Sequence, residues 1–334
     1  MNKEIRELIK EKAMSLGFNL VSFTDPEIST QDIEAYEDWL SKKRNADLVY
    51  MENASPRKDI SEILPGVKTI ITLATSYNSE EKPLTPGNLK IAKYAHGRDY
   101  HKFIKKRLKD LESFLRILFP EINTRSFVDA VPLLERSFAK KSGLGIIGKN
   151  SCLITKEFGS FVFLSEILCD INLGKDKLSN QDRDFGICGA CSLCIDSCPV
   201  KAIISPGVID ATRCIAYHTI ENKGEIPQEL GEKIRDSKYL FGCDICQKVC
   251  PHNAFKPYSK DLEITKKIAG DQIEISKIEN IKTEEGFAEI FKGSPLMRAK
   301  LKGLRRIIAL HSKKVLLENK AQKQKTHPKA DLNI

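Results

Sequence analysis

Apolar and polar residues alternate with two different periods along the first half of the chain. Residues 3–16 and 100–118 repeat apolar side chains every three or four positions, which predicts amphipathic helices, and the β-rich runs 18–23 and 68–75 predict strands. Similar patterns predict helices at 30–40, with Thr30 as cap, and at 131–141, a strand at 125–129, and a hairpin of 151–155 with 160–164. Strands mixed with helices over residues 1–172 indicate one α/β domain.

Two cysteine runs dominate the next segment. Residues 188–199 read C-x2-C-x2-C-x3-C-P, the bacterial ferredoxin pattern for iron–sulfur clusters. Residues 243–251 repeat that pattern without its first cysteine, which Cys214 can supply. Zinc sites usually lack the third cysteine and the CP ending, and disulfides do not fit a chain in which we expect no export signal. The runs therefore predict two 4Fe–4S clusters.

The same pattern assigns the eight cysteines to clusters. In two-cluster ferredoxins the cysteine before proline ligates the other cluster. One cluster is therefore expected on Cys188, Cys191, Cys194 and Cys250, and the other on Cys198, Cys214, Cys243 and Cys246. We expect the two remaining cysteines, Cys152 and Cys169, to be buried as small hydrophobes. Two clusters form a short electron wire, so the α/β domain should hold a redox cofactor or a reducible substrate.

Composition narrows the class of protein. The 334 residues, 41% of them hydrophobic, allow two or three domains with a sizeable core, and no apolar run approaches the length of a membrane span. Ten cysteines without an expected export signal favour the cytoplasm. The formal net charge of +9 permits an anionic partner without requiring one. We expect a monomer with no membrane association.

The last regular pattern is a basic helix at residues 295–310. Ser294 and Pro295 have the order of a cap and a first helical residue. One face of the expected helix carries Leu301, Leu304 and Ile308, and the other carries Arg298, Lys302, Arg305 and Arg306. The basic face could contact phosphates, or it could be an ordinary solvated surface. Residues 319–334 are polar and expected to be disordered.

Three other segments are candidates for chemistry. Residues 143–148 read G-x-G-x-x-G, but a helix pattern precedes them and a strand pattern follows, the reverse of a dinucleotide site. Asp129 stands between a strand and a helix, where a carboxylate could be a general acid or an ordinary helix cap. Residues 94–101, rich in tyrosine and histidine, could form a ligand loop or a solvated turn. The charged residues 174–183 form a natural linker between domains.

Taken together, these segments resemble the epoxyqueuosine reductase family. The resemblance rests on residues 55–58, 94–101, 128–136, 143–151 and 214–221, on the complete cysteine set, and on Gly293-Ser294-Pro295. It spans most of residues 50–310. Cysteine runs alone are shared by many ferredoxin-like proteins, whereas their combination with the segments at Asp129 and at Gly148-Lys149-Asn150 is specific.

The resemblance implies a cobalamin enzyme that reduces the epoxide of epoxyqueuosine, at the wobble position of tRNA, to queuosine. Residues 1–175 would be an α/β (α+β) nitroreductase-like domain that binds base-off cobalamin. Residues 176–258 would be a ferredoxin-like domain whose two clusters reduce cobalt to Co(I), fed by an external low-potential electron donor. Residues 259–334 would be a short helical HEAT-like segment that binds tRNA and ends in the polar tail.

The resemblance also implies roles for single residues. Asp129 aligns with the family's proposed proton donor. The segments that match the family's cobalamin contacts contain Arg57, Asp129, Tyr217, Gly242 and Asp244, and the tRNA contacts would be Arg298, Lys302, Arg305 and Arg306. The C-terminal segment has room for about one HEAT-like helix pair, and Ile307 stands where the family usually has asparagine. Nothing matches the D-x-H-x-x-G pattern with which other cobalamin proteins replace the lower base by histidine.

Two other functions fit part of the pattern. A cobalamin-dependent reductive dehalogenase-like enzyme, acting on a small molecule, would share the clusters and the cofactor but would not need a basic C-terminal helix. A ferredoxin-type electron carrier would leave the whole N-terminal domain without a purpose. The sequence therefore favours the tRNA-modifying reductase.

Overall fold

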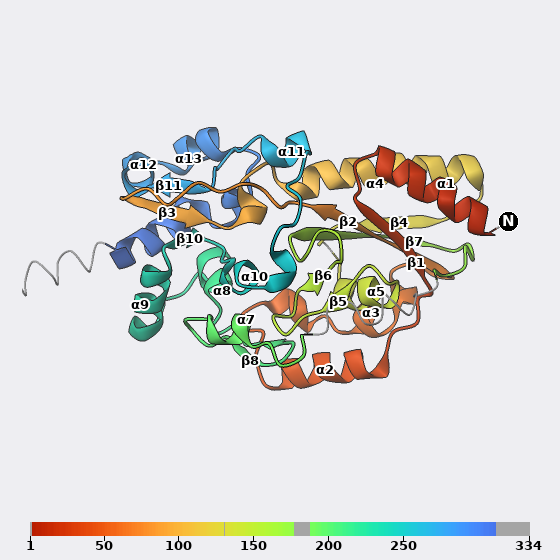
Figure 1. Cartoon of the computed structure of the whole chain (residues 1–334), viewed down its shortest axis with the longest axis horizontal. Helices are drawn as coiled ribbons and strands as arrows, with labels where there is room; N and C mark the ends of the chain where they lie inside the picture. The colour runs from red at the N-terminus through yellow and green to blue at the C-terminus, as the bar shows by residue number, and fades with distance from the viewer. Residues whose placement is uncertain (1, 130, 177–187, 312–334) are drawn as a thin grey trace, which may run out of the picture.

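The N-terminal part of the molecule is built on a four-stranded antiparallel sheet. The structure is a computed structural model that describes residues 2–129, 131–176 and 188–311. The strand order is β1 (Leu20–Thr24), β2 (Thr69–Ser76), β7 (Val162–Cys169) and β4 (Thr124–Phe127). Helices α1 (Asn2–Ser15) and α4 (Tyr100–Leu118) cover one face, and α5 (Glu135–Lys141) covers the other (Figure 1).

Burial explains why these segments form the sheet. All eight residues of β2 are buried, because this strand lies inside the sheet with helices on both faces. Leu73 of β2 and Ile167 of β7 pack with the apolar stripe of α4, while Ile70 and Leu168 face Phe138 of α5. Each fully buried side chain of this kind contributes roughly 1.5–3 kcal/mol relative to an exposed one. The sheet therefore separates two apolar cores.

A second sheet joins segments that lie far apart in the sequence. Strand β3 (Asn88–Ile91) pairs in parallel with β10 (Tyr239–Phe241) and antiparallel with β11 (Gln272–Glu274). Its core includes Leu89, Ile91 and Phe241 together with Leu304 and Ile308 of the C-terminal helix. The cysteine-rich segment thus shares a sheet with residues that precede it and residues that follow it.

Short elements carry the cysteine runs and the remaining connections. Helices α7 (Leu193–Asp196) and α10 (Ile245–Lys248) each begin inside a cysteine run, and α8 (Ile215–Ile220) directly follows Cys214. The other short elements are α2 (Thr30–Ser41), η1 (Val49–Glu52), α3 (Ser55–Lys58), η2 (Ile60–Glu62), η3 (Lys93–Ala95), β5 (Ile146–Ile147), β6 (Leu153–Ile154), β8 (Ile203–Ser205), β9 (Val208–Ile209), α9 (Gln228–Ser237), η4 (Pro251–Asn253), α11 (Leu262–Thr265), α12 (Ile275–Asn280), α13 (Glu284–Phe291) and η5 (Pro295–Arg298).

Helix α4 confirms its predicted bounds, whereas α5 begins later than predicted. The side chain of Asp99 caps α4 by accepting the backbone N–H of His101. The helix predicted from residue 131 begins at Glu135, because the chain first makes a tight turn in which the N–H of Leu133 donates to the carbonyl of Val131. At the second helix, Ser29 occupies the cap position predicted for Thr30, which is the first helical residue.

The predicted hairpin of residues 151–155 and 160–164 is wrong. Strand β6 pairs with β5, and β7 pairs with β2 and β4, so only a single bridge between Thr155 and Gly159 joins the two segments. The apolar residues of β7 face both covered sides of the sheet, which places this strand in the interior of the sheet.

The C-terminal basic helix is interrupted. Ser294 accepts the N–H of Leu296 as the predicted cap, but residues 295–298 form the 3-10 turn η5. A separate helix follows at residues 300–311, after Lys300 adopts a left-handed φ of 58°. Of the helices that the structure describes, none is both long and apolar enough to cross a membrane. Most of the predicted linker 174–183 and the whole tail 319–334 lie outside the described residues.

Candidate active site and iron–sulfur centres

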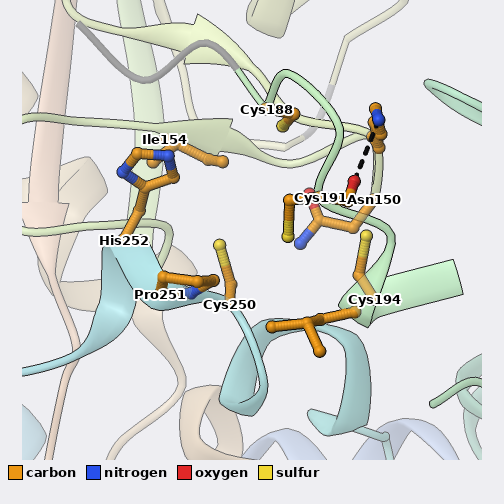
Figure 2. Close-up of a pocket in the computed structure, with 10 residues that line it drawn as sticks. Asn150, Ile154, Cys188, Cys191, Cys194, Cys250, Pro251 and His252 are labelled. Atoms are coloured by element: carbon orange, nitrogen blue, oxygen red, sulfur yellow. Dashed lines mark hydrogen bonds between the residues drawn. The ribbon is translucent and has the colours of Figure 1, made fainter. Parts of the chain in front are cut away.

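The structure brings the first predicted cysteine set around one cavity. Cys188, Cys191 and Cys194 line it from the first run, and Cys250 reaches it from the second run. Figure 2 shows their sulfur atoms arranged around a common space. The crossover of Cys250 is the arrangement that the CP pattern predicts for two-cluster ferredoxins.

Lys149 and Asn150 support this cavity, although the sequence analysis predicted no chemical role for either residue. The Lys149 ammonium donates to the carbonyl oxygens of Gly189 at 2.6 Å and Cys191 at 2.9 Å, the latter visible in Figure 2. Asn150 lines the same cavity and donates to the carbonyl of Cys246 at 3.4 Å, so it connects the two cysteine runs. The one feature of the sequence that could have indicated this role is their position directly after the glycine motif of residues 143–148. The motif itself packs against protein, because a Cβ on Gly145 would lie 2.2 Å from the carbonyl oxygen of Ile154.

The second cysteine set is gathered beneath the second sheet. Cys198, Cys214 and Cys243 pack against its apolar core, and the charges of Cys198 and Cys214 raise the pKa of both Cys243 and Cys246 after the larger effect of burial. Burial, followed by the neighbouring thiolates and Asp244, raises the pKa of Cys243 to about 12. Iron binding removes such protons, because the thiolate is the form that binds metal. Of the two remaining cysteines, Cys169 is buried as predicted and Cys152 is half-buried.

A larger cavity, of about 430 Å³, opens at the carboxyl end of β4. It is lined by Tyr50, Tyr94, Asp99, Tyr100, His101, Asp129, Ile220, Glu221, Pro295 and Arg298. These residues come from the N-terminal segment, from α8 and from the C-terminal basic region. The candidate ligand loop of residues 94–101 therefore contributes four of the ten lining residues, among them Tyr94 and Tyr100.

Asp129 is held at the edge of this cavity by a short hydrogen bond. Its Oδ2 accepts the hydroxyl of Tyr100 at 2.6 Å, and Tyr100 stacks on Phe163 in the core of the sheet. The side chain of Asp129 remains 58% exposed, so the carboxyl is accessible from the cavity. Burial, followed by the charge of Asp129, raises the pKa of Tyr100 far above its usual range, so this hydroxyl stays protonated as a donor.

A histidine lies on the other side of the Asp129 carboxyl. The Nε2 atom of His101 is 3.8 Å from Oδ2 of Asp129, and its Nδ1 atom is 2.8 Å from Oδ1 of Asp99. The neighbouring carboxylate fixes the orientation of the imidazole ring and favours a proton on Nδ1. Asp129 thus has a hydroxyl donor and an imidazole ring beside the same oxygen.

The other predicted cofactor residues do not line this cavity. Arg57 is buried, with its guanidinium over the ring of Tyr36 and hydrogen-bonded to the carbonyls of Asn53 and Tyr50. Tyr217 donates to Asp47. Asp244 is buried and accepts the backbone N–H of Lys93 at 2.8 Å. Burial raises the pKa of its carboxyl to about 6.

Gly242 connects the second cysteine set to the cavity. It adopts a φ of 69°, and a Cβ there would lie 2.5 Å from Cβ of Ala92 and 3.3 Å from a ring carbon of Tyr94. Only a glycine permits this approach, because any side chain would collide with the residues behind the cavity wall. Cys243, a predicted cluster ligand, is the next residue, so the second cysteine set begins directly behind Tyr94.

The predicted tRNA-binding residues do not form one free basic face. Arg298 lines the cavity and pairs with Glu221 at 2.6 Å. Arg305 donates to the carbonyl of Ile281, and Arg306 donates to the carbonyls of Gly224 and His218. Lys302 is exposed, and no carboxylate within the described ranges forms an ion pair with its ammonium group. The structure therefore gives these four side chains three different environments.

Comparison with known proteins identifies the family. Residues 57–130 match the family model described as epoxyqueuosine reductase QueG, DUF1730, and residues 187–253 match a 4Fe–4S double cluster binding domain. The epoxyqueuosine reductase of Cellulophaga algicola is 40% identical over 90% of this chain and 96% of its own length. That of Gloeobacter violaceus is 36% identical over 89% and 92%, respectively.

Solved structures agree with the sequence relatives. An epoxyqueuosine reductase bound to an epoxyqueuosine-modified tRNA-Tyr stem loop superposes with a TM-score of 0.85 at 28% identity, over 93% of this chain and 81% of that one. The Bacillus subtilis epoxyqueuosine reductase, with its catalytic aspartate loop swung out of the active site, gives 0.83 at 26% identity over the same shares. The chain therefore belongs to the epoxyqueuosine reductase family, whose members are oxidoreductases, and it carries a double 4Fe–4S cluster domain.

Proposed function

We propose that this chain reduces epoxyqueuosine within tRNA to queuosine and that Asp129 donates the proton to the epoxide oxygen. The observation that best supports this function is the position of Asp129. Its carboxyl is open to the 430 Å³ cavity, and one of its oxygens accepts a hydrogen bond from Tyr100. Cleavage of an epoxide C–O bond leaves negative charge on the oxygen. A proton delivered there lowers the barrier, which is the role of a general acid.

His101 is suited to return the proton that Asp129 gives away. Its Nε2 atom lies 3.8 Å from Oδ2 of Asp129, and its Nδ1 atom is hydrogen-bonded to Oδ1 of Asp99 at 2.8 Å. The ring also lines the cavity, where solvent protons have access to it. Asp129 can therefore be protonated again between turnovers.

We propose that the cavity also receives the corrin ring of cobalamin. Its lining fits a large planar group, because Tyr50 and Tyr94 present aromatic rings to it, and the Nε atom of the buried Arg57 beside Tyr50 has no hydrogen-bond partner among the described residues. Bound cobalamin would supply a strongly reducing cobalt centre for opening the epoxide. Tyr217, Gly242 and Asp244 would support this group from behind the cavity wall.

Electrons would reach the cavity through the two clusters. We assign one cluster to Cys188, Cys191, Cys194 and Cys250, and the other to Cys198, Cys214, Cys243 and Cys246. Electrons from an external low-potential donor would leave the second cluster beside Gly242 and Tyr94. Residues 1–175 would act as a nitroreductase-like catalytic domain, 176–258 as the cluster domain, and 259–334 as a HEAT-like tRNA-binding segment, in the cytoplasm where tRNA is found.

The tRNA anticodon would enter from the side of the C-terminal segment. Arg298 is the predicted phosphate contact that lies at the cavity itself, and Lys302 is exposed without an ion pair to a described carboxylate. The affinity for tRNA should therefore fall as the salt concentration rises, because each phosphate that a basic side chain neutralises releases counterions.

Replacement of Asp129 tests the proposal. Asp129→Asn removes the acidic proton with little change in shape, so nucleoside mass spectrometry should detect no queuosine after incubation with epoxyqueuosine-containing tRNA and a low-potential reductant. The variant should still bind about eight irons and one corrinoid. Asp110→Asn, an exposed change on α4, is the matched control and should react normally. Queuosine formation by the Asp129 variant at the control rate would exclude Asp129 as the acid.

A further inference from the structure

A pair of carboxyl groups, the buried Glu166 and the half-buried Glu135, lies beneath the loop that carries Asp129. Glu166 stands in the middle of β7, opposite Thr72 of β2 and Phe127 of β4, and none of its surface is exposed. It faces the α5 side of the sheet, where the carboxyl of Glu135, the first residue of α5, interacts with it. Among the described residues, no hydrogen-bond donor reaches either carboxyl oxygen of Glu166. The nearby hydroxyl of Thr72 is already paired with Ser142 at 2.6 Å.

Such a pair requires a shared proton. Two ionised carboxylates can only accept hydrogen bonds, so they repel one another unless one of them is protonated. Burial, and then the charge of Glu135, raises the pKa of Glu166 well above its usual range. Burial, and then Asp129, also raises the pKa of Glu135, while Arg136 opposes this shift. Glu166 is fully buried and no donor among the described residues reaches its oxygens, so it is the member that holds the proton, with Glu135 as the neighbouring carboxyl.

Glu135 carries this interaction to the reacting residue. Its Oε1 atom accepts the backbone N–H of Asp129 at 3.0 Å. Asp129 has a φ of 48°, a left-handed conformation that is unfavourable for a residue with a Cβ and persists only where its surroundings hold it. This conformation directs the Asp129 carboxyl to the hydroxyl of Tyr100.

We propose that Glu135 and Glu166 are positioning residues for Asp129: Glu166 supports Glu135 from within the sheet, and Glu135 holds the Asp129 backbone in the conformation that presents its carboxyl to the cavity. The inference rests on Asp129 being the proton donor proposed above. Neither glutamate touches the cavity, so both act through Asp129. An apolar residue would pack at position 166 without the cost of burying a carboxyl, which makes a purely structural role a poor explanation of Glu166.

Two substitutions of Glu166 separate positioning from packing. Glu166→Gln keeps the size and supplies an N–H donor to Glu135, whereas Glu166→Leu keeps the approximate size and removes the donor. We expect single-turnover reduction of epoxyqueuosine-containing tRNA to be roughly 10- to 100-fold slower in the leucine variant, because displacement of a reacting group by a fraction of an ångström has effects of that size. The glutamine variant should remain within about threefold of the wild type. Both should bind tRNA with unchanged Kd.

Infrared spectroscopy provides a readout that does not depend on activity. Anaerobic wild-type protein at neutral pH should show the carbonyl band of a buried protonated carboxylic acid. That band should persist in Asp129→Asn and disappear in Glu166→Gln. Hydrogen exchange at the Asp129 amide should be faster in Glu166→Leu and in Glu135→Ala than in the wild type, because each variant disrupts the acceptor of that N–H. Ser165→Ala, the buried neighbour on the opposite face of β7, is the matched control for both measurements.

The outcomes are distinguishable from those of the proposed function. An active Asp129→Asn variant would overturn the role of Asp129 whatever the glutamates do. An inactive Asp129→Asn variant together with a fully active Glu166→Leu variant would overturn the positioning role alone, as would a wild-type spectrum without the acid band. If Glu166→Leu does not fold, the band and the Asp129 amide exchange in wild type, Glu166→Gln and Glu135→Ala decide the question in its place.

Discussion

The hydroxyl of Tyr100 donates to Oδ2 of Asp129 across 2.6 Å, and the ring behind that hydroxyl is stacked on Phe163. The position of the Asp129 carboxyl is therefore set from two directions, by a side chain of α4 and by the backbone hydrogen bond to Glu135. The oxygen that does not face Tyr100 is the one available to a substrate.

Tyr100→Phe should slow the reduction while leaving tRNA binding unchanged. The variant keeps the stacked ring but removes the hydrogen bond that orients the carboxyl, so we expect kcat to fall roughly tenfold with little change in KM. Single-turnover kinetics followed by nucleoside mass spectrometry measures this effect. Tyr258→Phe, at an exposed position, is the control. An unchanged rate in the Tyr100 variant would show that the hydroxyl does not position Asp129.

Lys149→Met should make the first cluster more labile. Lys149 donates to two carbonyl oxygens of the loop that carries Cys188 and Cys191, and hydrogen bonds from a charged group are worth roughly 1.5–3 kcal/mol each. Loss of both should accelerate the release of iron to a chelator about tenfold or more, and it should affect half of the bound iron. Lys156→Met, an exposed lysine away from this loop, should release iron at the wild-type rate.

His96 should make the protein less stable in acid. Burial lowers its pKa from 6.5 to about 4, and its ring atoms are hydrogen-bonded to Ser79 and to the carbonyl of Ile91. Between these two pH values the unfolded chain binds a proton that the folded protein does not, so stability falls as pH decreases from about 6.5 to about 4. The loss should total about 3 kcal/mol.

Urea unfolding of the anaerobic holoprotein at several pH values measures this effect. His96→Gln cannot take up the proton, so the stability difference between the variant and the wild type should change in favour of the variant as pH decreases. Parallel pH dependences for the two proteins would show that His96 does not titrate in this way.

Lys302→Ala and Arg306→Ala should have opposite consequences. Lys302 is exposed, so its removal should weaken tRNA binding and reduce the slope of binding against salt by about one unit, without changing stability. Arg306 donates to the carbonyls of Gly224 and His218, so its removal should lower the free energy of unfolding by roughly 1–3 kcal/mol. Filter binding at several salt concentrations and urea unfolding separate the two effects. Equal effects of both variants on the salt slope would favour a continuous basic face.

The sequence predicted those parts of the fold that are specified locally. The apolar period of α4 is encoded within a few residues, and the predicted bounds agree with the structure. The pairing of β7 is specified by partners as distant as β2 and β4, which explains why a hairpin between neighbouring segments was the wrong prediction. Strands β3, β10 and β11 are too short to be recognised before their partners are known.

In the candidate site, too, the features encoded by neighbouring residues were predicted and those that depend on distant contacts were not. Cysteine spacing is a local pattern, and it predicted which thiols of the first set share a cavity. The position of Asp129 between a strand and a helix was also readable, and the resemblance added its role. By contrast, the contact of Glu135 with Glu166 and the approach of Gly242 to Tyr94 join residues far apart in the chain. No periodicity or motif encodes such contacts.

The parallel pairing of β3 with β10 has a consequence for biosynthesis. At about 5–20 residues per second, a ribosome completes β10 on the order of ten seconds after β3 has emerged. During that interval the edges of β3 and its side chains Leu89 and Ile91, fully covered in the finished protein, have no partner. Unpaired apolar strands aggregate, so the yield of folded enzyme should depend on temperature and chaperone supply more than on the stability of the finished molecule.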